Sequence, residues 1–248
     1  MNSAYDLDVV FPAELGKSTS KQIQGMSPTV VIPVGSIEQH GPHLPLDTDT
    51  RIATAVARAA ATNLEATGYP DELLLAPAVP YGASGEHEGF AGTVSIGTQA
   101  LTHLLLEYGR SAGDWAARLV FVNGHGGNVD ALRAAVMRLR GEGRDAGWCS
   151  CTARDGDAHA GHTETSILLH ISPQTVSTDR WHAGNVAPLA ELMPQMRRAG
   201  VAAVSEVGVL GDPTTATAAE GARIFAGMVE ACAACIRRWT PGGDGMLR

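Results

Sequence analysis

The stretch TVVIPVGSIEQHGPHLPLDTDT, residues 29–50, joins a β-branched apolar run to a loop rich in ionisable side chains. The run at 29–34 has the length and composition of a buried strand. Beyond the loop, apolar residues repeat at helical spacing: Ile52, Val56, Ala60 and Leu64. A strand, a loop and then an amphipathic helix form the repeating unit of a parallel sheet covered by helices.

The same alternation continues along the chain. Further strands are expected at four apolar runs, the last of them less regular: 73–79, 118–122, 147–153 and 201–209. Helical spacing marks four more segments: 101–108, 129–139, 167–171 and 224–239. The sequence therefore predicts a three-layer α/β/α fold with a mostly parallel central sheet. We expect one domain over 1–248, with loose ends near 1–27 and 240–248.

Composition narrows the class of protein. The 248 residues are 44% hydrophobic and 18% charged, which is typical of a globular chain and excludes a disordered one. The formal net charge is -8, and no basic cluster occurs, so we expect neither a nucleic-acid nor a membrane partner. The first residues, MNSAYDLDVVFPAEL, lack the basic and apolar segments of a signal peptide, which favours a cytoplasmic location.

Four cysteines invite a metal or redox interpretation. Cys232 and Cys235 form a C-x-x-C pair. They also continue a helical apolar stripe at 224–239, and Cys149 and Cys151 alternate on one face of an expected strand. Because free cysteine is among the most buried residue types, we interpret all four as core residues.

The loops after the strands hold the polar side chains of interest. In open α/β sheets, ligands bind beyond the carboxyl ends of the strands. The loops that follow the first four expected strands are 35–50, 80–93, 123–128 and 154–165. They contain six of the nine histidines: His40, His43, His87, His125, His159 and His162. This concentration predicts a functional site at one edge of the sheet.

Five side chains in these loops form a candidate ligand set. Glu38 and His40 are two residues apart in an extended segment and project to the same side, and Asp49 lies just before the expected helix. His125 and Glu164 follow the later strands. Imidazole and carboxylate ligands without thiolate are typical of catalytic zinc, iron or manganese sites. Five ligands exceed the need of one ion, so we expect one or two divalent metals per subunit, with Asp49 as the bridge.

Motifs that would indicate other functions are incomplete, lie between the wrong secondary-structure elements, or are absent. GHGGN at 124–128 is followed by Val129 where a dinucleotide fingerprint needs a small residue. GEGRDA at 141–146 follows a helix and precedes a strand, the reverse of the fingerprint order. The sequence contains no G-x-x-x-x-G-K-[ST] and no G-x-S-x-G, so nucleotide-binding and serine-hydrolase interpretations lose their support.

Four motifs in order resemble those of the creatininase family of creatinine amidohydrolase-like metal hydrolases. They are GSIEQHGPHLPLDTDT (35–50), EHEGFAGTVSI (86–96), VNGHGGN (122–128) and HAGHTETS (159–166). The resemblance extends from about residue 28 to about residue 225. Two later segments, AGNVAPLAELMP (183–194) and GVLGDPTTATAAEG (208–221), are most similar to one branch of the family, the mycofactocin-system peptidases.

The resemblance implies roles for particular positions. The family's metal ligands match Glu38, His40, Asp49 and His125, with Asp49 in the bridging place, and His159 matches a histidine near the reacting amide. Creatinine hydrolases carry a metal-binding glutamate where this chain has Gly127. Either Glu164 supplies that carboxylate or the second ion is held loosely, and the change argues against creatinine as the substrate. The family also implies a homo-oligomer, a hexamer.

The expected activity is metal-dependent amide hydrolysis by a peptidase. The branch implies cleavage of a modified precursor peptide near its C-terminus, releasing a fragment derived from the last two residues, Val and Tyr. A metal-bound hydroxide is the expected nucleophile, and iron or zinc is the expected metal, with manganese as a further option. His159 or a second ion would polarise the carbonyl, and Glu164 or His159 would protonate the leaving nitrogen. A structural role for His159, as a hydrogen-bond partner of a ligand, is the rival interpretation.

Four further loop side chains and the activity itself each admit more than one interpretation. His43, Glu86, His87 and His162 either shape the substrate pocket or support the ligands. Two other functions remain as alternatives: hydrolysis of a small cyclic amide such as creatinine, and a metal-binding scaffold without turnover.

Overall fold

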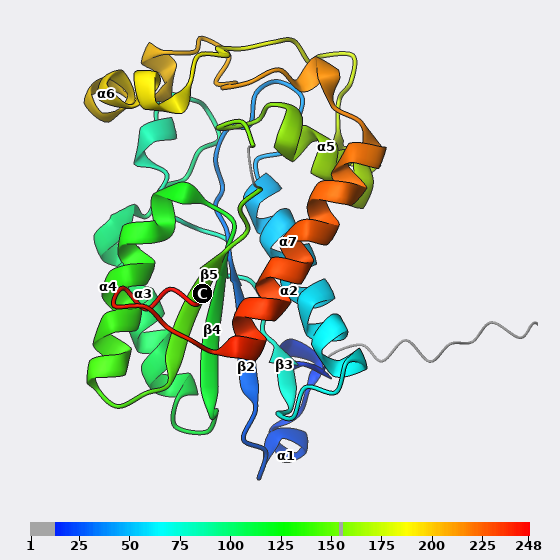
Figure 1. The fold of residues 1–248 in the computed structure, drawn as a ribbon. Coiled ribbons are helices and arrows are strands. Elements are labelled where there is room, and N and C mark those ends of the chain that lie inside the picture. The colour runs from blue at the N-terminus through cyan, green and yellow to red at the C-terminus, as the bar shows by residue number, and fades with distance from the viewer. Residues whose placement is uncertain (1–12, 154–155) are drawn as a thin grey trace, which may run out of the picture.

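Parallel strands form the centre of the molecule (Figure 1). The computed structural model describes residues 13–153 and 156–248. Within them, one five-stranded sheet has the order β1-β3-β2-β4-β5, and every neighbouring pair is parallel. The strands are β1 (Ala13–Glu14), β2 (Thr29–Val34), β3 (Leu73–Leu75), β4 (Arg118–Asn123) and β5 (Ala146–Ser150).

Helices cover both faces of this sheet, which confirms the predicted three-layer α/β/α fold (Figure 1). On one face α7 (Ala218–Arg238) packs against α2 (Thr48–Ala66) and α5 (His162–Ile171). On the other face α3 (Gly97–Ala112) packs against α4 (Val129–Gly141). Two further helices lie away from these layers: α1 (Ser20–Ile23) and α6 (Leu189–Ala199). Within the described residues, no helix combines the length and apolarity that crossing a membrane requires.

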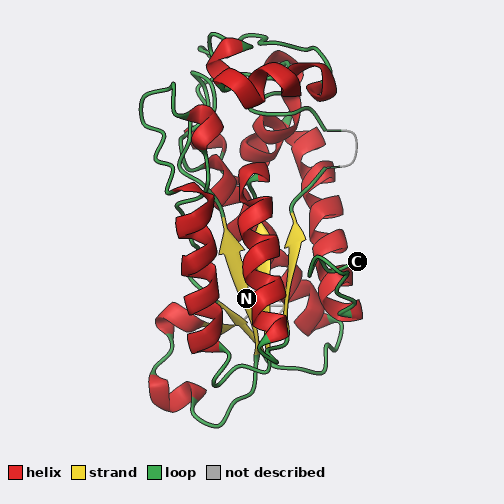
Figure 2. Cartoon of the chain, turned by 90° about the vertical axis from the view of Figure 1, so that its left-hand side faces the viewer, coloured by secondary structure: helices red, strands yellow, loops and turns green. Residues whose placement is uncertain are grey.

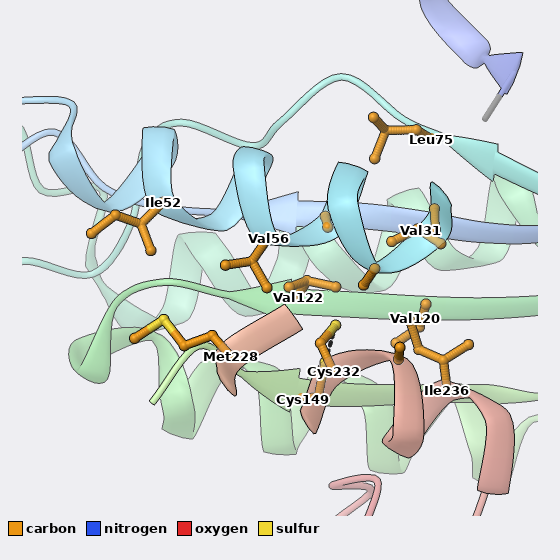
Figure 3. Packing of buried hydrophobic residues seen from close by; sticks show 14 of the residues in the cluster. Val31, Ile52, Val56, Leu75, Val120, Val122, Cys149, Met228, Cys232 and Ile236 are labelled. Atoms are coloured by element: carbon orange, nitrogen blue, oxygen red, sulfur yellow. Dashed lines mark hydrogen bonds between the residues drawn. The ribbon is translucent and has the colours of Figure 1, made fainter. Parts of the chain in front are cut away.

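The central strand β2 builds both halves of the core. All six of its residues are buried, as expected for a parallel strand with helices on both faces. Val31 packs with α2 and α7, whereas Val30 and Ile32 pack with α3 and α4. Figure 3 shows the first of these clusters, in which Val31 and Val120 from the strands lie near Ile236 of α7.

The cysteines belong to this core, as predicted. Cys149 and Cys232 are buried, with their sulfur atoms 3.6 Å apart, and both join the cluster between the sheet and α7 (Figure 3). Cys151 and Cys235 are partly buried and pack against the same cluster. The four thiols are free. The C-x-x-C spacing therefore reflects the apolar face of a helix.

One expected strand is wrong, and two others are shorter than expected. Residues 201–209 contain a single 3-10 turn, Val201–Ala203, followed by Gly208 at a φ of 79°. Their buried valines fill a small cluster beneath α6 and the adjoining core, so apolarity here reflects packing of loops and not pairing of strands. The strands expected over 73–79 and 147–153 end at Leu75 and Ser150, where the chain turns into the functional loops.

The chain ends also differ from the expectation. Residues 240–248 are anchored: Leu247 is 1% exposed, its N–H donates to the Trp148 carbonyl, and the Trp148 N–H donates to the Gly245 carbonyl. The tail thus covers the free edge of β5. At the other end, residues 13–27 include β1 and α1, while residues 1–12 lie outside the described residues.

Candidate active site

The carboxyl ends of the strands carry the ionisable side chains, as the fold predicts. Figure 2 shows the strands pointing toward a layer of loops and short helices at the top of the molecule. The loop after β2 holds Glu38 and His40, and the first turn of α2 holds Asp49. His125 follows β4, and Glu164 lies in the first turn of α5. Four separate segments therefore converge at one edge of the sheet.

Two carboxylates and two imidazoles form a tight buried cluster. His125 Nδ1 lies 3.2 Å from Glu38 Oε1 and 3.1 Å from Asp49 Oδ2. His40 Nε2 lies 3.2 Å from Asp49 Oδ1. All four side chains are buried. The structure therefore brings together Glu38, His40, Asp49 and His125, the four residues matched to family ligands.

Asp49 has the arrangement of a bridging carboxylate. Its Oδ1 faces His40, and its Oδ2 faces His125. The Ser36 hydroxyl donates to Oδ2 at 2.7 Å, which fixes the rotation of the carboxylate. One carboxylate with an imidazole on each oxygen can connect two cation positions.

The donor atoms fit a divalent cation. Both carboxylate oxygens of Glu38 are buried, and neither accepts a hydrogen bond within the described residues. Leaving a buried carboxylate without donors costs several kcal/mol. Ligand atoms on a cation at about 2.0–2.2 Å lie roughly 3–3.5 Å from one another, which is the spacing of this cluster.

Hydrogen bonds orient both imidazoles toward the carboxylates. His40 Nδ1 donates to the Glu38 carbonyl at 3.1 Å, so Nε2 is the ring nitrogen that faces the cluster. His125 has the opposite arrangement, because Nε2 donates to the Ala83 carbonyl at 3.2 Å and Nδ1 faces the carboxylates. Such backbone partners set the tautomer of a metal-binding histidine.

The negative charges in the cluster favour the protonated form of two of its histidines. Burial alone would lower the pKa of His40, but Asp49 and Glu164 raise it to about 10. Burial likewise opposes protonation of His125, yet Glu38 and Asp49 raise its pKa well above the usual value. Both rings thus hold protons where a metal would replace them. The cluster attracts positive charge.

Glu164 stands at the His40 side of the cluster. Its Oε2 lies 3.8 Å from His40 Nε2 and accepts a hydrogen bond from the Ala160 N–H at 2.7 Å. Burial raises the pKa of this carboxyl to about 7, although His40 acts in the opposite direction. Glu164, His40 and His159 offer ligand atoms within 4.8 Å of one another.

A second imidazole pair flanks Glu38. His159 Nδ1 lies 3.8 Å and His87 Nε2 3.5 Å from Glu38 Oε1, and their ring centroids are 4.4 Å apart. Burial lowers the pKa of His87 to about 4 and that of His159 to about 3, so both rings are neutral. His159 Nε2 donates to the Gln39 carbonyl at 2.8 Å, which directs the Nδ1 lone pair toward the cluster. His159 thus lies beside the site, as expected, and His87 joins it.

Gln39 is a residue that sequence reasoning missed. Its side-chain Nε2 contacts His87 Nδ1 at 2.8 Å and donates to the Gly208 carbonyl at 3.0 Å. Its side-chain Oε1 accepts a hydrogen bond from the Gly41 N–H. It therefore orients His87 and ties the first loop to the 208–211 segment. Its position between Glu38 and His40 was the available signal, but strand alternation placed it on the opposite side.

Gly127 stands where the family resemblance implied a metal-binding glutamate, and the Glu86 side chain approaches this position. A Cβ at this position would collide with the Ala83 carbonyl and would lie 2.5 Å from His125 Nε2 and 2.8 Å from Glu86 Oε1. The Glu86 carboxylate thus reaches the space beside Gly127, 3.6 Å from His125 Nε2. Glu86 joins Glu164 as a candidate source of the missing carboxylate.

Two of the six loop histidines stand outside the cluster. His43 Nε2 contacts the Thr165 hydroxyl at 2.9 Å, and His43 is buried between the first loop and α5. His162 Nδ1 contacts the Thr215 hydroxyl at 2.8 Å at the surface. Each of these contacts joins α5 to a neighbouring segment of the chain.

The cluster opens into a cavity of about 880 Å³. Asp49, Glu86, His125, His159 and Glu164 line one wall, and residues of α6 and the turn after it line the other. Cavities of about 300–1,000 Å³ accommodate ligands of drug size. Buried charged groups beside such a space are typical of a catalytic site.

Known proteins resemble this chain over nearly its whole length. The family model described as creatinine amidohydrolase matches residues 16–236. A protein named mycofactocin precursor peptide peptidase from Mycobacterium ulcerans (strain Agy99) is 68% identical over 249 residues, with 100% of both chains covered. A protein of the same name from Mycobacterium tuberculosis (strain ATCC 25618 / H37Rv) is 67% identical over 250 residues, again with 100% of both covered.

The fold agrees with these sequence matches. A solved structure described as "Creatininase Mn" has a TM-score of 0.74 and 25% identity to this chain, and the match covers 93% of this chain and 100% of that one. The α/β architecture and the ligand cluster at its carboxyl edge are thus found together with a hydrolase family. The chain belongs to the creatininase family of metal-dependent amide hydrolases.

Proposed function

We propose that this chain is a metal-dependent peptidase that cleaves a modified mycofactocin precursor peptide near its C-terminus and releases a fragment derived from the last two residues, Val and Tyr. The observation that carries this proposal is the buried Glu38, His40, Asp49 and His125 cluster opening into the large cavity. The choice of a peptide as the substrate rests on the two mycobacterial relatives at 67% and 68% identity.

We assign the ligands of up to two divalent cations. Glu38, Asp49 and His125 would hold one, with Glu86 as a further carboxylate 3.6 Å from His125 Nε2, and His40, Asp49 and Glu164 would hold the other. Iron or zinc suits these nitrogen and oxygen donors, and manganese is the third candidate. A bound cation supplies an activated water and polarises the substrate carbonyl.

His159 is assigned as a proton acceptor beside the reacting amide. Its Nε2 is engaged with the Gln39 carbonyl, so the free atom facing the cluster is the Nδ1 lone pair. A ring with a pKa of about 3 stays neutral at physiological pH and accepts a hydrogen bond from water at that atom. We therefore propose that His159 orients the water and does not polarise the carbonyl.

Where a single cation is bound and Glu164 is not its ligand, we assign Glu164 as the acid that protonates the leaving nitrogen. Burial holds its pKa near 7, so a substantial fraction carries a proton at neutral pH. The carboxyl lines the cavity and is partly exposed, within reach of a bound amide. An amine leaves poorly unless it is protonated, so this proton lowers the barrier to cleavage.

The test is reconstitution of the metal-free protein. The chelated enzyme is loaded without oxygen with Fe²⁺, Zn²⁺ or Mn²⁺, and each form is assayed by mass spectrometry on the modified peptide, with creatinine in parallel. We expect no activity after chelation, recovery with one of the ions, and cleavage of the peptide but not of creatinine. Full activity in the chelated protein would overturn the proposal, and turnover of creatinine alone would replace it with cyclic-amide hydrolysis.

We also propose a homo-oligomer, a hexamer as the family resemblance implies, acting in the cytoplasm as one domain over residues 1–248. Light scattering of the purified protein measures the assembly. A mass of six chains is the expected result, and a monomer would contradict it.

A further inference from the structure

The wall of the cavity opposite the metal cluster is built by α6. Of the residues in this helix, Leu192 is buried, where it packs with Val201 and Leu210. The other apolar side chains of the helix, Leu189, Met193 and Met196, line the cavity. An amphipathic helix normally turns its apolar side to a core. Here much of that side borders the space in front of the reacting groups.

The turn after α6 fixes this wall next to the cluster. Gly200 has a φ of 73°, and a Cβ there would lie 2.8 Å from the Glu86 carbonyl oxygen. The Gln195 side chain donates to the Ala203 carbonyl, which closes the helix onto the following turn. Figure 1 shows α6 beyond the carboxyl ends of the strands. The end of the helix is therefore held against the loop that carries Glu86 and His87.

That end of the helix presents two cations to the cavity. Arg197 and Arg198 lie in the last turn of α6, and both line the cavity. Within residues 13–153 and 156–248, neither guanidinium forms an ion pair or a side-chain hydrogen bond. Glu88 and Glu86, the acids on the neighbouring loop, line the same cavity without pairing with them. A helix C-terminus favours cations, but two unpaired arginines facing a substrate cavity need a second explanation.

We propose that Arg197 and Arg198, together with Leu189, Met193 and Met196, form a subsite that binds a carboxylate of the peptide substrate. The inference rests on the proposed peptidase function and names the chemistry that the substrate must offer. Guanidinium groups bind carboxylates with paired hydrogen bonds, and the methionines supply an adaptable apolar surface for the adjoining chain. The carboxylate is either an acidic side chain or the C-terminal carboxyl group.

The size of the cavity supports a substrate longer than one residue. Its volume of about 880 Å³ spans both the metal cluster and α6. A small cyclic amide would fill only the part next to the cluster. A peptide could place its cleaved bond at the cluster and a charged residue at the arginines.

The test compares two double variants with equal loss of charge. Arg197→Gln/Arg198→Gln removes the proposed subsite, and Arg133→Gln/Arg223→Gln removes two arginines outside the cavity, each paired on its own helix. Binding of a fluorescent precursor peptide is measured by anisotropy with the chelated protein, so no cleavage interferes. We expect the first variant to weaken binding about tenfold and to lose the salt dependence, and the control to bind as the parent does.

Two altered peptides identify the source of the carboxylate. One has a C-terminal amide, and the other has Asn and Gln in place of its acidic residues. Loss of the recognised carboxylate should weaken binding of the peptide to the parent protein about tenfold. The same peptide should then bind the parent protein and the Arg197→Gln/Arg198→Gln variant equally well. If neither peptide differs from the parent peptide, or if the first variant binds like the control, the inference is overturned.

Kinetics and assembly separate this inference from other outcomes. In the metal-loaded enzyme, the first variant should raise KM about tenfold with kcat and metal content unchanged. Arginine-dependent binding without any cleavage would leave the subsite standing and refute the proposed function. A changed molecular mass with unchanged peptide binding would mean that α6 contacts a second copy of the chain, which also overturns the inference.

Discussion

Strand β2 and Glu38 in the loop that follows it are equally buried but chemically opposite. Val30, Val31 and Ile32 are 0% exposed and pack on apolar neighbours. Glu38, only a few residues later, is also 0% exposed, but its carboxylate accepts no hydrogen bond from the described part of the chain and faces the His125 ring. The first region stabilises the fold by removing apolar surface from water. The second keeps buried charge that packing does not require. The difference separates the part of the chain that specifies structure from the part that specifies function.

The largest expected effect is the loss of activity in Glu38→Gln, which is compared with a core variant, Leu132→Ala. The amide keeps the volume of Glu38 but removes a proposed metal ligand, so we expect loss of metal and about a thousandfold or greater loss of activity. The metal-free variant should lose little stability, because His125 can release its proton. Metal analysis and chemical denaturation measure both quantities.

Leu132→Ala should show the reverse pattern. Leu132 is fully buried between α4 and the sheet, so its truncation should lower the free energy of unfolding by about 2–5 kcal/mol. Metal content per folded protein should stay the same. If Glu38→Gln destabilised the protein as much as Leu132→Ala and retained its metal, the separation of the two regions would be wrong.

A smaller effect is expected at the two glycines after His125. Gly127→Ala places a Cβ against the Ala83 carbonyl and His125 Nε2, so the imidazole must move. Disturbing the support of a metal-binding histidine typically lowers metal affinity about 10–100-fold. Gly126→Ala is the matched control, because nothing lies within 4 Å of its Cβ position. Competition with a fluorescent chelator measures both, and equal affinities for the two variants would contradict the assigned role of His125.

The pH dependence of stability sharpens the same comparison. The folded pKa of His40 is raised from 6.5 to about 10, so its contribution to the metal-free protein is complete below 6.5 and is lost as pH rises toward 10. A cation replaces this proton, so metal binds more tightly at higher pH. We expect the Tm difference between zinc-loaded and metal-free protein to grow from pH 6.5 to 9. A difference that shrinks over this range would count against His40 as a ligand.

The smallest effect is expected at the core thiols. Cys232→Ala removes a sulfur atom that lies 3.6 Å from Cys149 Sγ, so the free energy of unfolding should fall by about 1 kcal/mol. Metal content and activity should not change, since the thiol is remote from the carboxyl edge of the sheet. Denaturation and metal analysis decide the point, and loss of metal would reinstate the C-x-x-C pair as a ligand site.

Local patterns were sufficient to predict the layers of the fold. The β-branched run at 29–34 and the stripe at Ile52 and Val56 depend on spacing alone, and both elements formed as expected. The strand predicted from the apolar residues at 201–209 was wrong, because Val201 and Val209 are buried by loops and not by sheet pairing. The anchored tail also escaped prediction, since its contact with Trp148 joins residues far apart in the chain.

The site followed the same division. Glu38, His40, Asp49 and His125 could be found because each lies in the loop after a strand or in the first turn of a helix. The positions of His87 and Glu86 depend on how the 80–93 loop folds back over the cluster, which no periodicity encodes. The two arginines of α6 are a stronger case, because that helix was not predicted and only the tertiary structure brings it to the cavity.

Anomalous X-ray diffraction from crystals of the zinc-loaded protein, at the zinc edge, tests the ligand assignment most directly. A peak within about 2.0–2.2 Å of Glu38, Asp49 and His125 side-chain atoms is the predicted result, with a second peak at His40 if two ions bind. A zinc ion bound elsewhere, with these four side chains left free of metal in an active enzyme, would contradict it.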